Sequence, residues 1–218
     1  MPDFSHRLDK QELMDDLSRP DQEFEQAYRE LEVTNRRLGG IRAVERFLPK
    51  DSNLLMLDVA AGGCDVSEAL LGHFGRGSAR IIALDINSRG FRFARKSWPV
   101  VGDALELPFR ESTFDVVMAS LFFHHLSNEA CVHALANMWR VSRRLVLVND
   151  LHRHPVAYFS IRALSAAFSR SVMFRHDAGV SVLRAFKPPD LLHIAQQAGV
   201  PAQVHRSFPF RLVLVAEK

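Results

Sequence analysis

A chain of 218 residues, 47% of them hydrophobic, can bury one substantial core, which predicts a single α/β domain and argues against two full domains. The formal net charge of +3 comes from 28 basic and 25 acidic residues that are scattered or paired, so the charge pattern excludes a basic nucleic-acid-binding tract. Cys64 and Cys131 show no CxxC or Cys/His ligand spacing, so neither a disulfide framework nor a zinc site is expected.

The cysteines and the distribution of apolar residues predict where the protein is located. Cysteines without a pairing pattern fit a reducing compartment, so we expect a cytoplasmic protein. Residues 1–21 contain several acids and no apolar run, which argues against a signal peptide. Because no window reaches about 18 uninterrupted apolar residues, we also expect no membrane span.

The first periodic segment lies near the N-terminus. Apolar residues recur at helical spacings between residues 21 and 48, and Gly39-Gly40 interrupts them. We therefore predict two helices that form an N-terminal cap, assigned to residues 1–50, ahead of a main domain over residues 51–218.

Strands and helices then alternate along the chain. Residues 54–59 are apolar on both faces, which is typical of a buried parallel strand. Further strands are predicted at 80–86, 100–101, 114–120 and 145–149, and helices at 65–74, 88–96 and 128–141. This alternation predicts a parallel sheet with right-handed crossovers.

The last part of the chain has a different pattern. A helix is predicted from Lys187 to about Ala198, and residues 202–208 and 211–216 form two strands that must pair antiparallel because their connection is short. The intervening residues 151–186 are too many for a plain loop. We predict a helical insertion above the carboxyl edge of the sheet, where open α/β folds bind ligands.

The turn after the first predicted strand carries the strongest functional signal. Asp58 lies near the end of that strand, small residues at 60–63 let a ligand approach the backbone closely, and the helix that starts near Asp65 offers unpaired N–H groups. Neither GxGxxG nor GxxxxGK[ST] is present, which argues against a bound pyrophosphate. An NAD-dependent oxidoreductase is disfavoured for the same reason.

This segment resembles the strand-one motif of the class I S-adenosylmethionine (SAM)-dependent methyltransferases. Residues 57–65 follow their Asp-x-Gly-x-Gly-x-Gly pattern, and Asp85 matches their ribose-binding acid. Residues 102–109 match their adenine-edge motif, and residues 114–120 match their fourth strand. The resemblance extends over residues 54–218 and implies an α/β fold: a Rossmann-like, seven-stranded, mostly parallel sheet with an antiparallel last strand.

The resemblance also implies SAM as the cofactor and S-adenosylhomocysteine (SAH) as its product. Asp85 would accept hydrogen bonds from both ribose hydroxyls, and Asp103 would accept one from the adenine amino group. Ala60 and Cys64 replace glycines of the motif, so we expect a less open approach to the methionine arm. The residues expected to bind the cofactor are Asp58, Ala60, Ala61, Gly62, Asp85, Ile86, Asp103, Ala104, Ser120 and Leu121.

Candidate catalytic residues follow the fourth and fifth strands. Methyl transfer is an in-line displacement, so alignment supplies much of the catalysis, and an acceptor that must lose a proton needs a base such as histidine. His125 is the preferred base, and we expect His124 to turn toward the adjoining helix, although both could serve packing alone. Asp150 and His152 are expected to support the site or to bind the acceptor.

Two further groups of residues allow alternative interpretations. A charged group in the insertion is either an anion site or surface charge: Arg175, His176, Asp177 and Arg184. A metal site is an alternative for the histidines near the strand ends, but no set of carboxylate ligands accompanies them, and we expect no metal. These histidines are His124, His125, His152 and His154.

Together these features predict an enzyme, a SAM-dependent methyltransferase that acts on oxygen or carbon of a small apolar or aromatic, polyketide-like acceptor. Residues 146–151 and 175–186 resemble a bacterial subgroup that acts in secondary metabolism. A quinone-precursor methyltransferase and a SAM-binding regulatory protein of the same fold are the alternatives. We expect a small-molecule acceptor as the partner, no nucleic acid and no membrane span, and a homodimer is an open alternative.

Overall fold

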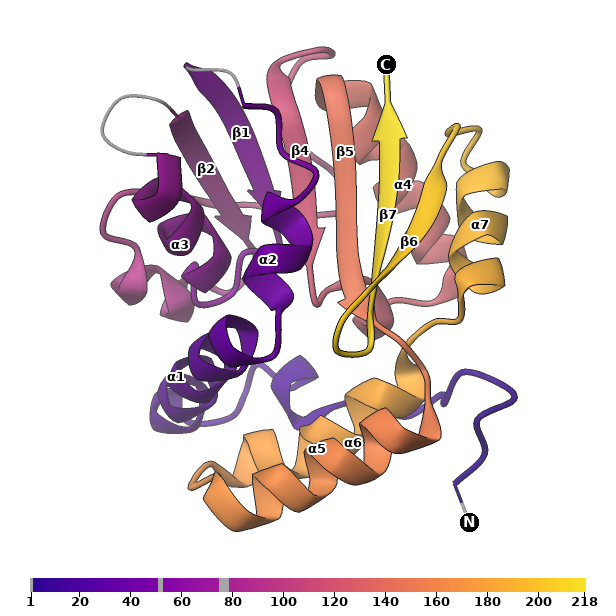
Figure 1. Ribbon diagram of the computed structural model, residues 1–218. Coiled ribbons are helices and arrows are strands. Elements are labelled where there is room, and N and C mark those ends of the chain that lie inside the picture. Colours follow the sequence, from indigo (N-terminus) through magenta and orange to yellow (C-terminus); the bar gives the residue numbers. More distant parts are fainter. Residues whose placement is uncertain (1, 51–52, 75–78) are drawn as a thin grey trace.

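A seven-stranded sheet forms the centre of the computed structural model, which describes residues 2–50, 53–74 and 79–218 (Figure 1). The strand order is β3-β2-β1-β4-β5-β7-β6, in which β7 runs antiparallel to both of its neighbours and β1 to β5 are parallel. The predicted fold class is confirmed. The strands are β1 (Leu54–Val59), β2 (Ala79–Asp85), β3 (Trp98–Val101), β4 (Phe114–Ser120), β5 (Ser142–Leu151), β6 (Gln203–Ser207) and β7 (Arg211–Glu217).

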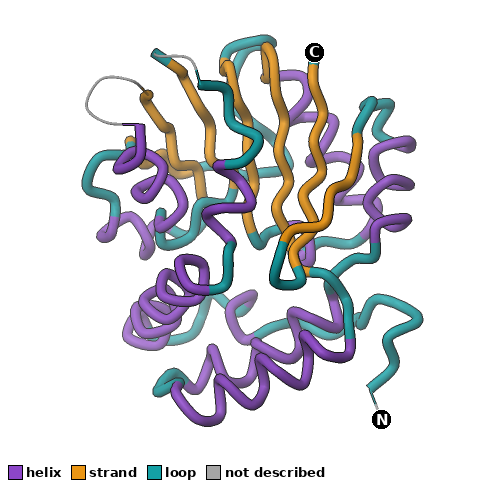
Figure 2. Tube along the Cα trace, in the orientation of Figure 1, coloured by secondary structure: helices purple, strands orange, loops and turns teal. Residues whose placement is uncertain are grey.

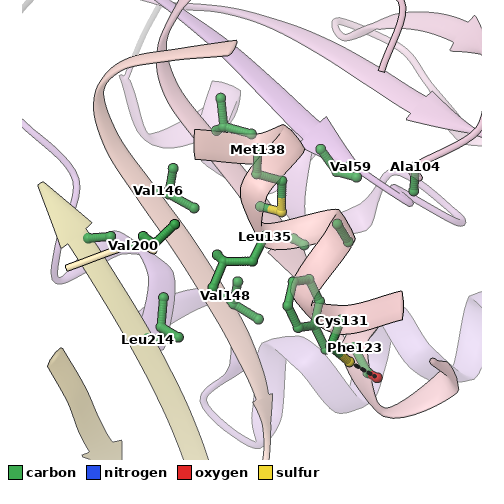
Figure 3. Packing of buried hydrophobic residues seen from close by; sticks show 14 of the residues in the cluster. Val59, Ala104, Phe123, Cys131, Leu135, Met138, Val146, Val148, Val200 and Leu214 are labelled. Carbon is green, nitrogen blue, oxygen red and sulfur yellow. Dashed lines mark hydrogen bonds between the residues drawn. The ribbon is translucent and has the colours of Figure 1, made fainter. Parts of the chain in front are cut away.

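Helices cover both faces of the sheet because its central strands are apolar on both faces. One face packs against α2 (Gly40–Glu45) and α3 (Asp65–Phe74), and the other against α4 (Asn128–Val141) and α7 (Pro188–Gln197). Figure 3 shows Leu135 and Met138 of α4 lying over Val146 and Val148 of β5. Each such side chain contributes about 1.5–3 kcal/mol when fully buried.

A third group of helices lies beyond the carboxyl ends of the parallel strands. It comprises α1 (Asp21–Arg37), α5 (Pro155–Phe168) and α6 (Val172–Arg184), drawn below the sheet in Figures 1 and 2. A short 3-10 helix, η1 (Leu13–Asp15), contacts α6. The predicted insertion over the strand ends is therefore present as two helices.

The N-terminal helices break where the glycines predict a break. Between α1 and α2, Gly39 adopts φ +73°, and a Cβ at this position would lie 2.6 Å from the Phe208 carbonyl oxygen. Only glycine fits such a left-handed turn against another backbone. Residues 51–52, which open the predicted main domain, lie outside the described residues.

The prediction of an α-helix over residues 88–96 is wrong. The structure has a short 3-10 helix, η2 (Ser88–Phe93), after which the chain runs into β3. The backbone N–H groups of residues 95–97 all donate to Glu68 Oε1 of α3 at 2.9 Å, so they are unavailable for helical hydrogen bonds. A tertiary contact thus overrides the local apolar spacing.

The bounds of β5 and the character of the helices can also be compared with the prediction. β5 is longer than predicted because its antiparallel pairing with β7 runs from Leu145 to Leu151. Among the helices of the described residues, none combines the length and the apolar character needed to cross a membrane.

Candidate active site

The turn between β1 and α3 adopts left-handed backbone conformations at three positions, of which only one is a glycine. Ala60, Gly62 and Cys64 have φ values of +56°, +51° and +58°, all in the left-handed region. A non-glycine residue there costs roughly 1–2 kcal/mol. The Cys64 side chain is buried and does not line a neighbouring cavity, so the expectation that it narrows the approach to a ligand is wrong.

A cavity of about 310 Å³ opens at the carboxyl ends of β1, β2 and β4, and we call it the strand-end cavity. Nine of the predicted cofactor residues line it: Ala60, Ala61, Gly62, Asp85, Ile86, Asp103, Ala104, Ser120 and Leu121. The tenth, Asp58, does not line it. Its buried carboxyl accepts a hydrogen bond from Ser67 Oγ at 2.6 Å, and burial raises the pKa of Asp58 to about 7.

Asp85 ties two loops of the strand-end cavity together. Its carboxylate accepts hydrogen bonds from the backbone N–H of Gly62 and of Asn87, both at 2.7 Å. Burial raises the pKa of Asp85, and these two bonds partly offset that effect. Each carboxylate oxygen has a second lone pair, so Asp85 can still accept hydroxyl donors from a ligand.

A second cavity, of about 260 Å³, lies between α1, α5 and α6, and we call it the apolar cavity. Its wall is mainly aliphatic and aromatic, with Leu31, Leu38, Ile161, Leu164 and Phe174 among the lining residues. Four residues line both cavities: Met14, Leu31, Leu121 and His125. The two cavities therefore meet beside His125.

Each histidine of the predicted pair is held by a carboxylate. His125 Nδ1 lies 2.6 Å from Asp15 Oδ1, and His124 Nδ1 lies 2.7 Å from Asp150 Oδ1 on β5. Because a carboxylate accepts, Nδ1 carries the proton and Nε2 of the neutral ring holds a lone pair. The expectation that His124 turns toward α4 is wrong, because its ring lies between Asp150 and Glu12.

Glu12 completes this group, and no sequence pattern distinguishes it from the other acids near the N-terminus. Its side chain is buried, its Oε1 has no hydrogen-bond partner, and its Oε2 accepts from Ser181 Oγ at 2.7 Å. Burial raises the pKa of Glu12 to about 7. Nε2 of His124 lies 3.6 Å from Oε1, and Nε2 of His125 lies 4.0 Å from Oε2.

Comparison with known proteins agrees with this geometry. Residues 56–144 match the family described as a methyltransferase domain. Demethylmenaquinone methyltransferase of Thermobifida fusca (strain YX) is 37% identical over 113 residues, which cover 46% of this chain and 45% of that protein. The chain thus matches less than half the length of this curated relative.

Solved structures give the same fold. A SAM-dependent methyltransferase from Aquifex aeolicus has a TM-score of 0.66 at 15% identity and covers 87% of this chain and 96% of that one. Human N-acetylserotonin methyltransferase in complex with SAM has a TM-score of 0.69 at 16% identity, and the match covers 95% of this chain and 59% of that one. Residues 56–144 thus match a methyltransferase domain, and the whole chain has the fold of the SAM-dependent methyltransferases.

Asp150 lies behind the histidines and lines neither cavity. It is fully buried and accepts hydrogen bonds from the backbone N–H groups of His124 and Leu151. Burial raises the pKa of Asp150, but the adjacent His124 more than offsets this, so the net shift is downward. Asp150 is therefore placed to orient His124 and is out of reach of an acceptor.

Two charged residues of the insertion, Asp177 and Arg184, make hydrogen bonds within the protein. Asp177 accepts the backbone N–H groups of Leu13 and Met14 at 2.8 and 3.0 Å. Arg184 donates to the carbonyl oxygens of His124 and His125. These bonds hold the N-terminal segment and the histidine loop against α6. Asp177 and Arg184 are therefore engaged within the protein and do not form an anion site.

Two polar residues of α1 also line the strand-end cavity, and the sequence analysis missed both. Tyr28 packs on the Gly62-Gly63 backbone, and its hydroxyl accepts from Asn87 Nδ2 at 3.3 Å. Asn35 donates to Asp65 Oδ2 at 2.9 Å. Their helical spacing indicated only a buried helix face.

Proposed function

We propose that this protein is a SAM-dependent methyltransferase that moves a methyl group from SAM to an oxygen or carbon of a small apolar or aromatic acceptor. The observation that carries the proposal is the meeting of the strand-end cavity and the apolar cavity beside His125. Reactants seated in adjoining cavities are brought into line, and this alignment supplies much of the catalysis of a displacement reaction.

The residues of the strand-end cavity fit SAM. Asp85 and Asp103 supply carboxylates for ribose and adenine, and Ile86, Ala104 and Leu121 supply apolar surface for the ring. Among the described residues that line the cavity there is no lysine or arginine, whereas Asp15, Asp65, Asp85 and Asp103 are present. Such a site favours a cationic ligand, and SAM carries a sulfonium.

His125 is the residue we assign to proton removal. SAM supplies an electrophilic methyl group, and the acceptor oxygen or carbon must give up a proton as it takes that methyl. His125 lines both cavities, and Asp15 Oδ1 holds its Nδ1 at 2.6 Å, which leaves Nε2 free to accept a proton. His125 would take the proton, and Asp15 would stabilise the imidazolium that forms.

Quinone-precursor methylation is a second candidate. The demethylmenaquinone methyltransferase of Thermobifida fusca is the relative that favours it, and the apolar cavity suits an apolar ring system. The two free, buried cysteines fit the reducing cytoplasm in which we propose that the protein acts.

The proposal is tested by calorimetry with SAH, followed by transfer of labelled methyl from SAM to a panel of resorcinol-like phenols and quinols. We expect saturable SAH binding and labelled product from one acceptor class, which also separates the two candidates. Binding of SAH without transfer to any acceptor would instead support a regulatory SAM-binding protein. No heat and no thermal shift at millimolar SAM would reject the proposal.

A further inference from the structure

We propose that Glu12, His124 and His125 form a binding site for a divalent transition-metal ion in the wall of the apolar cavity. Each residue offers one ligand atom, and these atoms lie within 4.8 Å of one another. Two imidazoles and one carboxylate form a ligand set that holds zinc and other first-row metals while leaving coordination positions open.

The orientation of both rings supports the assignment. Nδ1 of His124 is bonded to Asp150 and Nδ1 of His125 to Asp15, so each ring presents its Nε2 lone pair toward Glu12. Metal-binding histidines commonly donate their other ring N–H to a carboxylate in this way, which fixes the tautomer and raises the basicity of the ligand nitrogen. Both histidines carry such a carboxylate here.

Glu12 provides an independent observation. Its side chain is 4% exposed, and Oε1 lacks a hydrogen-bond partner although it faces His124 Nε2 at 3.6 Å. A buried carboxylate without a full set of partners is costly unless it is paired or coordinates a metal.

The surrounding charges leave room for a cation. The carboxylates of Asp15, Asp150 and Asp177 lie next to the cluster, and the Arg184 guanidinium lies 3.7 Å from Glu12 Oε1. Arg184 directs hydrogen bonds to the carbonyl oxygens of Lys10, His124 and His125 rather than to Glu12. Two further arginines act on the same group, since Arg7 donates to the His124 carbonyl oxygen and both Arg7 and Arg211 are attracted to Asp150. Four carboxylates against three arginines still leave net negative charge for a divalent ion to offset.

All three proposed ligands line the apolar cavity, so an ion held by them is accessible to a molecule bound there. This consequence rests on the proposed methyl transfer. A hydroxyl oxygen of the acceptor bound to the ion would ionise more readily and release its proton to water. The Nε2 lone pair of His125 cannot bind the ion and accept the proton at once, so His125 takes the proton only in the ion-free protein, and in both cases its removal lowers the rate.

The test is calorimetric titration of untagged, chelator-treated protein with Zn²⁺, together with Co²⁺ absorption spectra that report tetrahedral nitrogen and oxygen ligation. We expect one ion per chain. Glu12→Gln should weaken Zn²⁺ binding by about 100-fold, since even indirect support of a metal ligand is worth about 10- to 100-fold. His125→Asn should do the same.

His152→Ala is the matched control, because His152 lines the same cavity but lies outside the cluster. It should bind Zn²⁺ as the unmodified protein does, and all variants should keep the circular dichroism spectrum. Absence of stoichiometric binding, or binding that survives both Glu12→Gln and His125→Asn, overturns the proposal. SAH titration of the same samples reports on methyl-donor binding separately.

Discussion

At the scale of single residues, two positions of the β1–α3 turn have a backbone conformation that normally favours glycine, although neither is a glycine. Ala60 and Cys64 both have positive φ. The surrounding contacts fix this backbone, since Ala61 N–H bonds to the Leu84 carbonyl and Cys64 N–H to that of Ala61. Local strain of this kind persists where the surroundings over-determine the conformation, and it is common at binding sites.

Ala60→Gly should therefore stabilise the protein by up to about 1 kcal/mol, because relief of strain exceeds the added entropy of the unfolded chain. Urea denaturation measures the change. Ala61→Gly is the control, since Ala61 lacks a positive φ, and it should destabilise by roughly 0.5–1 kcal/mol. Equal effects of the two substitutions would contradict the argument.

Asp58 should make stability depend on pH. Its pKa is raised from 3.8 to about 7 mainly by burial, so the folded state binds the proton more tightly than the unfolded state. The stabilisation is complete below about pH 4 and is lost as the pH rises toward 7. Asp58→Asn should raise the melting temperature at pH 8 and change it little near pH 4. A gain that does not vary with pH would refute this account.

Asp85→Asn tests the assignment of the ribose acid while retaining one oxygen for the loop hydrogen bonds. Loss of charge-assisted bonds to hydroxyls should weaken SAH binding by about 1.5–3 kcal/mol. Calorimetry gives the value. Unchanged affinity, in a variant that melts like the unmodified protein, would remove Asp85 from this role.

His125→Ala tests the residue at the junction of the cavities. Turnover should fall on the order of 100-fold, the usual contribution of a positioned base, whereas SAH affinity should hold. Single-turnover transfer of labelled methyl measures the rate. An unaltered rate would mean that His125 only packs.

At the scale of elements, the sequence predicts best those segments whose own pattern decides their structure. β1, β4, α3 and α4 have the predicted bounds because uninterrupted or periodic apolar residues, with a Ser127 cap on α4, determine them. The helix over 88–96 could not be excluded from sequence, because it is prevented by Glu68, a residue distant in the chain.

The candidate site shows the same limit. The carboxyl ends of parallel strands must lie together at one edge of the sheet. The motif spacing therefore predicted nine of the ten residues that we expected at the strand-end cavity, and Asp58 is the exception. Glu12 and Asp15 reach the histidines only through the fold of the N-terminal segment, more than a hundred residues earlier in the chain. No local pattern marks such a contact.

The N-terminal segment depends on α6, and Asp177 is the strongest link between them. Asp177→Ala removes two charge-assisted bonds to the backbone of η1 and should lower stability by about 1.5–3 kcal/mol. Because Glu12 precedes η1 and Asp15 is its last residue, methyl-transfer turnover should fall more than SAH affinity. A proportional loss of both would contradict this division of roles.

At the scale of the whole molecule, the fold separates two tasks. The sheet and its turns supply most of the lining of the strand-end cavity, and α1 and the N-terminal segment supply the rest. The apolar cavity is lined largely by α1, α5 and α6, the helices that lie beyond the carboxyl ends of the parallel strands (Figure 1). Loops and insertions over a fixed sheet let one fold serve many acceptors. Acceptor choice should therefore follow the lining of the apolar cavity, while the strand-end residues stay with the methyl donor.

The most direct measurement is a crystal structure of the complex with SAH. We predict the ribose at Asp85, the adenine beside Ala104 and the sulfur at the junction near Leu121 and His125, facing the apolar cavity. An SAH molecule whose sulfur points away from that cavity, or a strand-end cavity that stays empty at saturating SAH, would contradict the account.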